Sequence, residues 1–359
     1  MSSTAPAAAV SQPPRTDVPR GAARARDPFF DNAKLLAVIL VVWGHSWGPL
    51  VGDAEHYRGL RAAYLLVYLF HMPLFIMICG WFSRSFAENA SHPARLRRLL
   101  TSTVVPYLIF ATAYTLQRNY RTHWEPMQLL RPWYLTWFLV ALFVWRATAP
   151  IWRIVRYPVV VATAAMLAVG ATEPSGDLVL GQVLQFLPFF VLGLTVPAER
   201  LQQLRDSRAL RRAAVPIFVL AFAGCYWLAP RLRSSEWLYH RSGHEHLHVS
   251  LLHWMGVTLV VALVGLVLSA AFLALVPRRE NRLTSLGAGS QYTYLLHGFL
   301  VQAVLGWGGY KLHLWSTWPG YLLLSALGVV VALLCATAPV RRVLRWAVEP
   351  EMRWAFKTG

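Results

Sequence analysis

The chain has 359 residues, of which 56% are hydrophobic and only 14% are charged, whereas about 25% of the residues of an average soluble domain are charged. These charges are too few to cover the surfaces of a soluble protein of this length, and many apolar runs are long enough to cross a bilayer as helices. The composition therefore excludes a soluble enzyme, a disordered protein and a disulfide scaffold. Because the apolar runs are continuous, they also argue against the short alternating segments of a transmembrane β-barrel.

The charge balance is strongly basic, with 34 Lys and Arg residues against 16 Asp and Glu residues and a net charge of +18. Most basic residues lie between the apolar runs, so membrane topology and anionic lipid headgroups explain the excess, and no nucleic-acid partner is expected. The three cysteines, Cys79, Cys225 and Cys335, lie far apart inside apolar runs. They predict neither a disulfide framework nor a metal site.

Residues 1–28 are rich in Ala, Pro, Ser and Arg and contain no apolar run, so we expect a disordered cytoplasmic tail rather than a signal peptide. The rest predicts an all-α polytopic membrane protein with about ten transmembrane helices over 29–345, followed by a cytoplasmic C-terminal tail, 346–359. The predicted spans are 33–50, 62–82, 99–117, 133–150, 157–171, 180–197, 213–230, 250–276, 290–308 and 318–340.

The loops between these spans test the layout. With both termini in the cytoplasm, most of the 34 basic residues fall in cytoplasmic segments, as the positive-inside rule requires. An error in one helix would exchange the two sides after it and weaken this bias. The asymmetry therefore favours an even number of spans in a multi-pass protein of the cell membrane.

The first span carries the clearest polar constellation, Asp31, Lys34 and His45. Eleven residues separate Lys34 from His45, which is close to three helical turns, so both side chains share a face and lie roughly 16 Å apart along the axis. Such a track suits an anionic cytosolic ligand with a long arm, and acyl-coenzyme A has that form. The alternative is that Lys34 extends to the interface and His45 bonds a neighbouring helix.

Two further histidines lie at membrane depth. His71, two residues before Pro73, is predicted at a depth similar to that of His45, where two imidazoles could form an acid/base pair or bond to a carbonyl. His297 lies about two turns into the ninth span and could line the same cavity or support a helix contact.

Other candidates lie near helix ends. Arg95, Arg97 and Arg98 precede the third span, where they could bind phosphate oxygens or anchor the topology. Trp137, like many of the 16 tryptophans, could belong to an interfacial belt or stack on a sugar. The histidines of the loop 240–248 lack the HExxH spacing of a zinc site and are expected to form a solvated loop.

Six segments in chain order resemble the acyltransferase-3 family of membrane O-acyltransferases. The first span, DNAKLLAVILVVWGHS, is similar to that family's first helix, and Lys34, in place of the usual arginine, resembles the fucose 4-O-acetylase-like subgroup. The other segments are FHMPLFIMICGWF, an RxxR element at Arg95 and Arg98 followed by VPY, WFLVALF, FLPFFVLG and YLLHGF.

The resemblance implies a transfer of an acyl group, most simply acetyl, from cytosolic acyl-CoA to a hydroxyl of a carbohydrate or similar acceptor, without a bound cofactor. His45 would be the essential residue. His71 would position the acceptor or stabilise the developing charge, and Asp31 would orient Lys34 or the arginines. Lys34, Arg95 and Arg98 would hold the CoA phosphates, and Trp137 and His297 would contact the acceptor. The alternatives are a transporter or flippase for a lipid-linked or anionic glycan, and a membrane sensor or assembly subunit with structural histidines.

Overall fold

The computed structural model describes residues 27–51, 58–88, 93–121, 124–172, 177–232 and 235–356, so most of the predicted N-terminal tail lies outside the described residues. Within these ranges the fold is helical and contains no strand. The helices are α1 (Pro28–Trp47), α2 (Arg58–Phe82), α3 (Arg84–Glu88), α4 (Pro93–Leu99), α5 (Val105–Asn119), α6 (Trp137–Thr148), α7 (Ile151–Ile154), α8 (Pro158–Thr172), α9 (Leu180–Gln185), α10 (Leu187–Thr195), α11 (Ala198–Asp206), α12 (Arg208–Leu228), α13 (Glu236–Tyr239), α14 (Leu251–Leu275), α15 (Ser290–Gly306), α16 (Trp318–Cys335) and α17 (Ala338–Val348).

Six helical segments of the described chain are long and apolar enough to cross a membrane, and each overlaps a predicted span. They are 28–50, 58–82, 93–119, 208–228, 251–275 and 318–335. The remaining four predicted spans are helical but shorter: 134–148 and 158–172, the pair α9 and α10, which is interrupted at Phe186, and α15 with 17 residues. The structure therefore supports a multi-pass membrane protein.

Two predicted boundaries differ from the structure because of local capping. The first helix begins at Pro28, five residues before the predicted start, because the Asp27 carboxylate caps it by accepting from the amide N–H of Phe29. The last span ends at Cys335, since Thr337 and Pro339 begin the separate helix α17, which continues to Val348.

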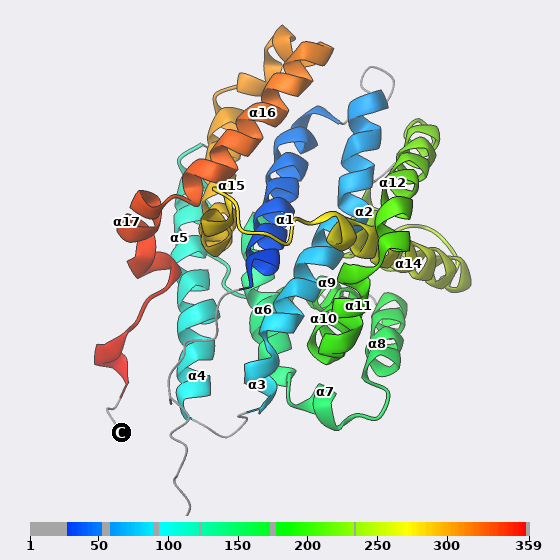
Figure 1. The fold of residues 1–359 in the computed structure, drawn as a ribbon. Helices are drawn as coiled ribbons and strands as arrows, with labels where there is room; N and C mark the ends of the chain where they lie inside the picture. The colour runs from blue at the N-terminus through cyan, green and yellow to red at the C-terminus, as the bar shows by residue number, and fades with distance from the viewer. Residues whose placement is uncertain are drawn as a thin grey trace, which may run out of the picture.

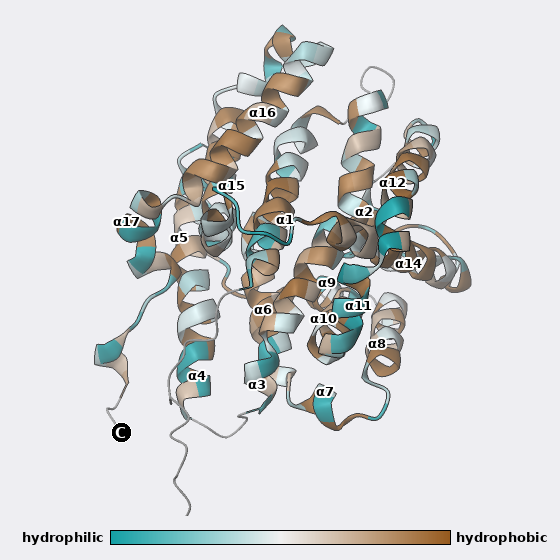
Figure 2. Ribbon diagram, viewed as in Figure 1, coloured by the Kyte–Doolittle hydropathy of each residue, from teal (hydrophilic) through white to brown (hydrophobic). Residues whose placement is uncertain are grey.

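Helix α2 lies at the centre of the bundle, where it contacts α1, α10, α12 and α14. Figure 1 shows α1 and α2 side by side, with α16 beside α1 and α12 beside α2. Large apolar side chains of the outer helices are exposed, among them Leu220 of α12, Leu263 of α14 and Leu322 of α16. This exposure fits contact with lipid, and Figure 2 shows hydrophilic residues gathered on α4, α11, α17 and the start of α12.

A close approach of two backbones joins α2 to α10. A Cβ atom added at Gly193 would lie 2.0 Å from the carbonyl oxygen of Met77, and one added at Gly80 would lie 2.2 Å from that of Phe190. Two glycines thus let the backbones touch, as small residues do in many membrane helix pairs.

We expect Gly193→Val to force α10 away from α2 and to lower the free energy of unfolding by about 1–3 kcal/mol, the usual cost of overpacking. Thermal unfolding in detergent measures the loss. The matched control is Gly224→Ala in α12, where an added Cβ has no atom within 4 Å. Equal melting temperatures for the two variants would contradict the packing argument.

Candidate active site

A cavity of about 630 Å³ contains the first-span histidine, His45. Aromatic side chains from separate parts of the chain contribute to its wall: Tyr68, Trp133, Tyr134, Trp137, Phe186 and Tyr239. His71 and Gln182 also line it, and Arg241 is the charged side chain among its described lining residues. We call this space the His45 cavity. It has aromatic faces and several polar groups, as a site for a hydroxylated ligand requires.

Two rings contact His45 directly. The Tyr134 ring meets it edge-on, with centroids 5.1 Å apart, and the His297 ring lies 5.3 Å away at an interplanar angle of 53°. Tyr134 has a φ of +55°, a left-handed conformation that costs a bulky residue energy and is found most often at functional sites. The backbone strain at Tyr134 thus accompanies a contact with His45.

His71 and His297 are anchored in the same way. Both side chains are buried, and each Nδ1 lies 2.9 Å from the carbonyl oxygen four residues earlier, that of Val67 or Thr293. Because a carbonyl oxygen only accepts, each Nδ1 carries its proton and donates. In the neutral ring this leaves Nε2 as an acceptor.

A glycine allows α2 to bring its polar face to the cavity. A Cβ atom at Gly44 would lie 2.9 Å from the Tyr68 ring, so only the absence of a side chain lets Tyr68 approach α1 this closely. The Tyr68 ring in turn contacts His71, with centroids 4.7 Å apart. Tyr68 and His71 are three residues apart and share a helix face, a spacing that the sequence alone could have revealed.

Asp31 and Lys34 lie at the other end of α1. Lys34 Nζ is 2.7 Å from the Asp31 carboxylate and 5.1 Å from the centre of the Phe82 ring. Fourteen residues separate Asp31 from His45, or roughly 21 Å of helix. The structure therefore does not bring Asp31 to the His45 cavity.

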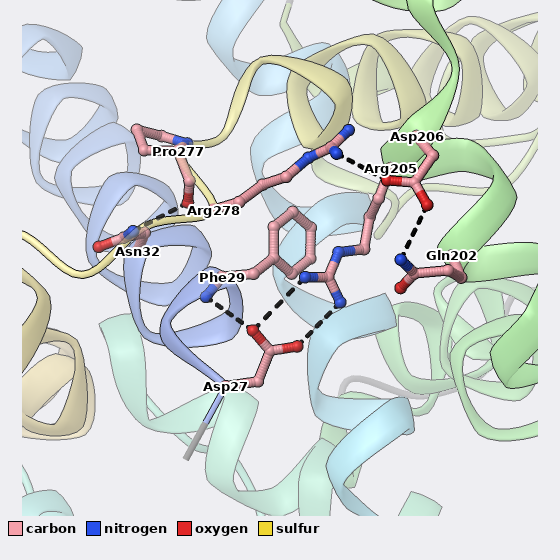
Figure 3. A network of polar contacts seen from close by, with 8 residues as sticks. All are labelled: Asp27, Phe29, Asn32, Gln202, Arg205, Asp206, Pro277 and Arg278. Atoms are coloured by element: carbon pink, nitrogen blue, oxygen red, sulfur yellow. Dashed lines mark hydrogen bonds and ion pairs between the residues drawn. The ribbon is translucent and has the colours of Figure 1, made fainter. Parts of the chain in front are cut away.

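Polar contacts hold the start of α1 in place (Figure 3). The Asp27 carboxylate accepts from Arg205 at 2.8 Å, and the Arg205 guanidinium lies 4.0 Å from the centre of the Phe29 ring. The Asn32 amide donates to the carbonyl of Pro277 at 2.9 Å. The side-chain oxygen of Asn32 accepts from Thr284 at 2.8 Å. Residues from α11 and the segment before α15 thus fix where α1 begins.

A second space, of about 500 Å³, lies between α4, the π-helical turn 100–104 and the segment after α17. We call it the arginine cleft, because Arg97, Arg98 and Arg353 line it together with Ser102 and Gln291. It lies at the Lys34 end of the bundle, since Arg98 is 3.4 Å from Ser85, three residues after Phe82. π-helical turns often occur at functional sites.

The segment after α17 contributes an acidic residue to the cleft. The Glu351 carboxylate pairs with Arg345 at 2.9 Å and with Arg353 at 2.8 Å, and its backbone carbonyl accepts from Arg97 at 3.1 Å. Arg95 has a different position: it donates to the carbonyls of Arg146 and Ala147 near the end of α6. Of the two arginines of the RxxR element, only Arg98 lines the cleft.

Helix α15 has one residue on the arginine cleft and another in contact with His45. Gln291 lines the arginine cleft, and His297, six residues later, contacts His45. Six residues correspond to about 9 Å along a helix, which is the axial separation of these two residues.

The structure thus places Trp137 and His71 on the His45 cavity and His297 beside it. The sequence did not predict Tyr134, Gln182 and Arg241 on the cavity or Arg353 on the cleft. Tyr134 and Gln182 lie inside predicted spans, but only tertiary packing determines that they face the cavity, and Arg241 and Arg353 lie outside the predicted spans, where no periodic signal marks them.

Near the cavity, Glu236 pairs with Arg241 and His246 and accepts from Ser242. Burial raises the pKa of Glu236, but the Ser242 hydrogen bond and the charges of Arg241 and His246 lower it further, so the net pKa lies below its usual value.

Lys34→Met should leave the nearly buried Asp31 carboxylate without its cation and lower the free energy of unfolding by about 1–3 kcal/mol, less than for a fully buried pair. Adding Asp31→Asn should recover part of the loss, because the uncompensated charge disappears. Thermal unfolding of the two single variants and the double variant measures the coupling. Strictly additive losses would show that the contact contributes nothing.

A family model described as an acyltransferase domain, that of the acyltransferase-3 family, matches residues 27–337. No curated protein and no solved structure gives a significant match. The matched residues carry α1 with Lys34 and His45, the aromatic cavity, the α4 arginines and α15. The resemblance of the six segments is therefore confirmed at the level of the family, and the chain belongs to the acyltransferase-3 family of membrane acyltransferases.

Proposed function

We propose that the protein transfers an acyl group, most simply acetyl, from acyl-CoA at the arginine cleft to a hydroxyl of a carbohydrate or similar acceptor in the His45 cavity. The observation that carries the proposal is the position of His45: it lines an aromatic cavity, and its ring contacts that of the buried His297. The proposal places the chain in the fucose 4-O-acetylase-like subgroup, on account of Lys34.

The donor half of the proposal rests on charge and reach. Guanidinium groups match phosphate oxygens in bidentate geometry, and Arg97, Arg98 and Arg353 lie together in the cleft with the Ser102 hydroxyl nearby. The pantetheine arm would follow α15 toward His45. Arg95 would stabilise the end of α6 through its hydrogen bonds to backbone carbonyls. That Lys34 also binds the donor stays a prediction.

The acceptor half rests on the cavity wall. Aromatic faces such as that of Trp137 suit the apolar faces of a sugar ring, and Gln182 offers a side-chain amide to hydroxyl groups. His71 would help to position the acceptor. With ten spans and both termini in the cytoplasm, the arginine cleft would face the cytosol and the His45 cavity would lie toward the opposite side.

In the direct reaction, a ring nitrogen of His45 takes the proton of the acceptor hydroxyl while the oxygen attacks the thioester carbonyl. The carbon–sulfur bond breaks, the new ester remains on the acceptor, and the proton passes from His45 to the CoA thiolate. In the other route the acyl group passes first to His45 and then to the hydroxyl. Both routes require His45 and release free CoA.

His45→Ala should lower acyl transfer at least about 100-fold, since a positioned general base contributes that much or more. The assay follows free CoA released from acetyl-CoA by the detergent-purified protein, with the glycans of the host cell as acceptors. The matched control is His253→Ala, at an exposed histidine of α14. Equal CoA release by wild type and His45→Ala would refute the proposal, as would glycan transport into sealed vesicles without CoA release.

A separate experiment tests the donor site. CoA at 100 times its dissociation constant should stabilise the folded protein by about 2.7 kcal/mol, and the shift should shrink strongly in Arg98→Gln with Arg353→Gln. Arg156→Gln, at an exposed arginine before α8, should keep the full shift. An unchanged shift in the double variant would place the donor elsewhere.

A further inference from the structure

We infer that His297 is the positioning partner of His45: its Nε2 accepts a hydrogen bond from a ring N–H of His45 and so aims the other nitrogen of His45 into the cavity. The inference rests on the proposed function and deepens it. It assigns His297 to the orientation of the base, in place of the contact with the acceptor that the sequence suggested.

The first support is an unpartnered acceptor. The His297 side chain is fully buried, and its Nε2 has no hydrogen-bond partner within the described structure. Its Nδ1 donates to the Thr293 carbonyl at 2.9 Å, so Nε2 of the neutral ring holds a lone pair. A buried acceptor without a donor raises the free energy of the folded protein. A hydrogen-bond donor that reaches Nε2 during the reaction cycle would remove this penalty.

The second support is the identity of the available donor. The hydroxyls of two tyrosines at α15 already have hydrogen-bond acceptors. Tyr294 donates to the carbonyl of Leu135, and Tyr114 donates to the carbonyl of Leu295. Two rings lie against His297: that of His45, at 5.3 Å between centroids, and that of Tyr294, at 6.3 Å, whose hydroxyl is the one bonded to Leu135. His45 is half-buried and lines the cavity. The inferred hydrogen bond requires its ring to turn so that one nitrogen points at Nε2 within hydrogen-bond distance.

The third support is a comparison within the site. His71 is anchored by the same hydrogen bond to the fourth preceding carbonyl, but its ring contacts Tyr68. The contact of His297 with His45 therefore results from the packing of α15 against α1. Burial and the same backbone hydrogen bond do not give His71 such a contact.

The chemical consequence concerns the tautomer of His45. When one ring nitrogen of His45 donates to His297, the other holds the lone pair that takes the hydroxyl proton. The acceptor oxygen then bonds to the acyl carbon, the carbon–sulfur bond breaks, and the proton moves from His45 to the CoA sulfur. His297 keeps its own proton throughout and stabilises the transient His45 imidazolium, the task that a carboxylate performs in the serine hydrolase triad.

The test separates orientation from binding. His297→Leu should lower kcat at least tenfold while KM for acetyl-CoA stays within about twofold, because no contact with the donor is lost. His297→Gln should recover part of kcat, since its side-chain oxygen can accept a hydrogen bond near the position of Nε2. Ser269→Ala, which removes a buried hydroxyl of α14, controls for general destabilisation and should keep kcat.

Several results would overturn the inference: a folded His297→Leu variant with wild-type kcat, a raised KM with unchanged kcat, or a glutamine variant no more active than the leucine variant. Should His297→Leu fail to fold, His297→Asn takes its place, because the shorter amide does not reach the position of Nε2. Equal kcat for the Gln and Asn variants would then overturn it. If His45→Ala retains transfer, the proposed function itself fails, and the two failures are distinguishable.

Discussion

The site depends on the axial position of α1. One rigid helix carries Lys34 near its first turn and His45 near its last, so a shift of its start would move both side chains together. Asp27, held by Arg205, and Asn32, held by the segment before α15, fix that start through groups that lie outside the apolar part of the helix. The charged contacts that anchor α1 are thus far from the histidine that they position.

The polar groups inside the bundle obey a second constraint, because the hydrocarbon layer offers no water to satisfy them. His71 and His297 satisfy Nδ1 with a hydrogen bond to their own helix, while Nε2 of His297 has no partner within the described structure, and His45 faces a cavity. Arg95 and Arg97, at the Lys34 end of the bundle, meet the constraint by donating to backbone carbonyls. The described structure therefore has two separate polar spaces, and α15 places Gln291 on the arginine cleft and His297 against the His45 ring.

Much of this architecture follows from the sequence. Continuous apolar runs predicted the helices, and helical periodicity placed Lys34 and His45 on one face of α1. The sequence did not predict the breaks at Phe186 and after Cys335, because local capping decides them. It also missed which arginines face the cleft, since that depends on the rotation of α4 against α6 and α17. The contact of His45 with His297 joins residues about 250 positions apart in the chain, and only tertiary packing determines it.

The short helices near the cavity have a consequence for the surrounding membrane. The helical segment 134–148 and α8 each contain 15 residues, or about 22 Å of helix, against a hydrocarbon core of about 30 Å. In the proposed ten-span arrangement both cross the bilayer, and α8 exposes Val160 and Val161 on its outer surface. In that arrangement a helix this short is matched by local thinning of the bilayer or by flanking side chains that extend to the interface. The lipid beside α8 is therefore where the proposed ten-span arrangement predicts a thinner bilayer.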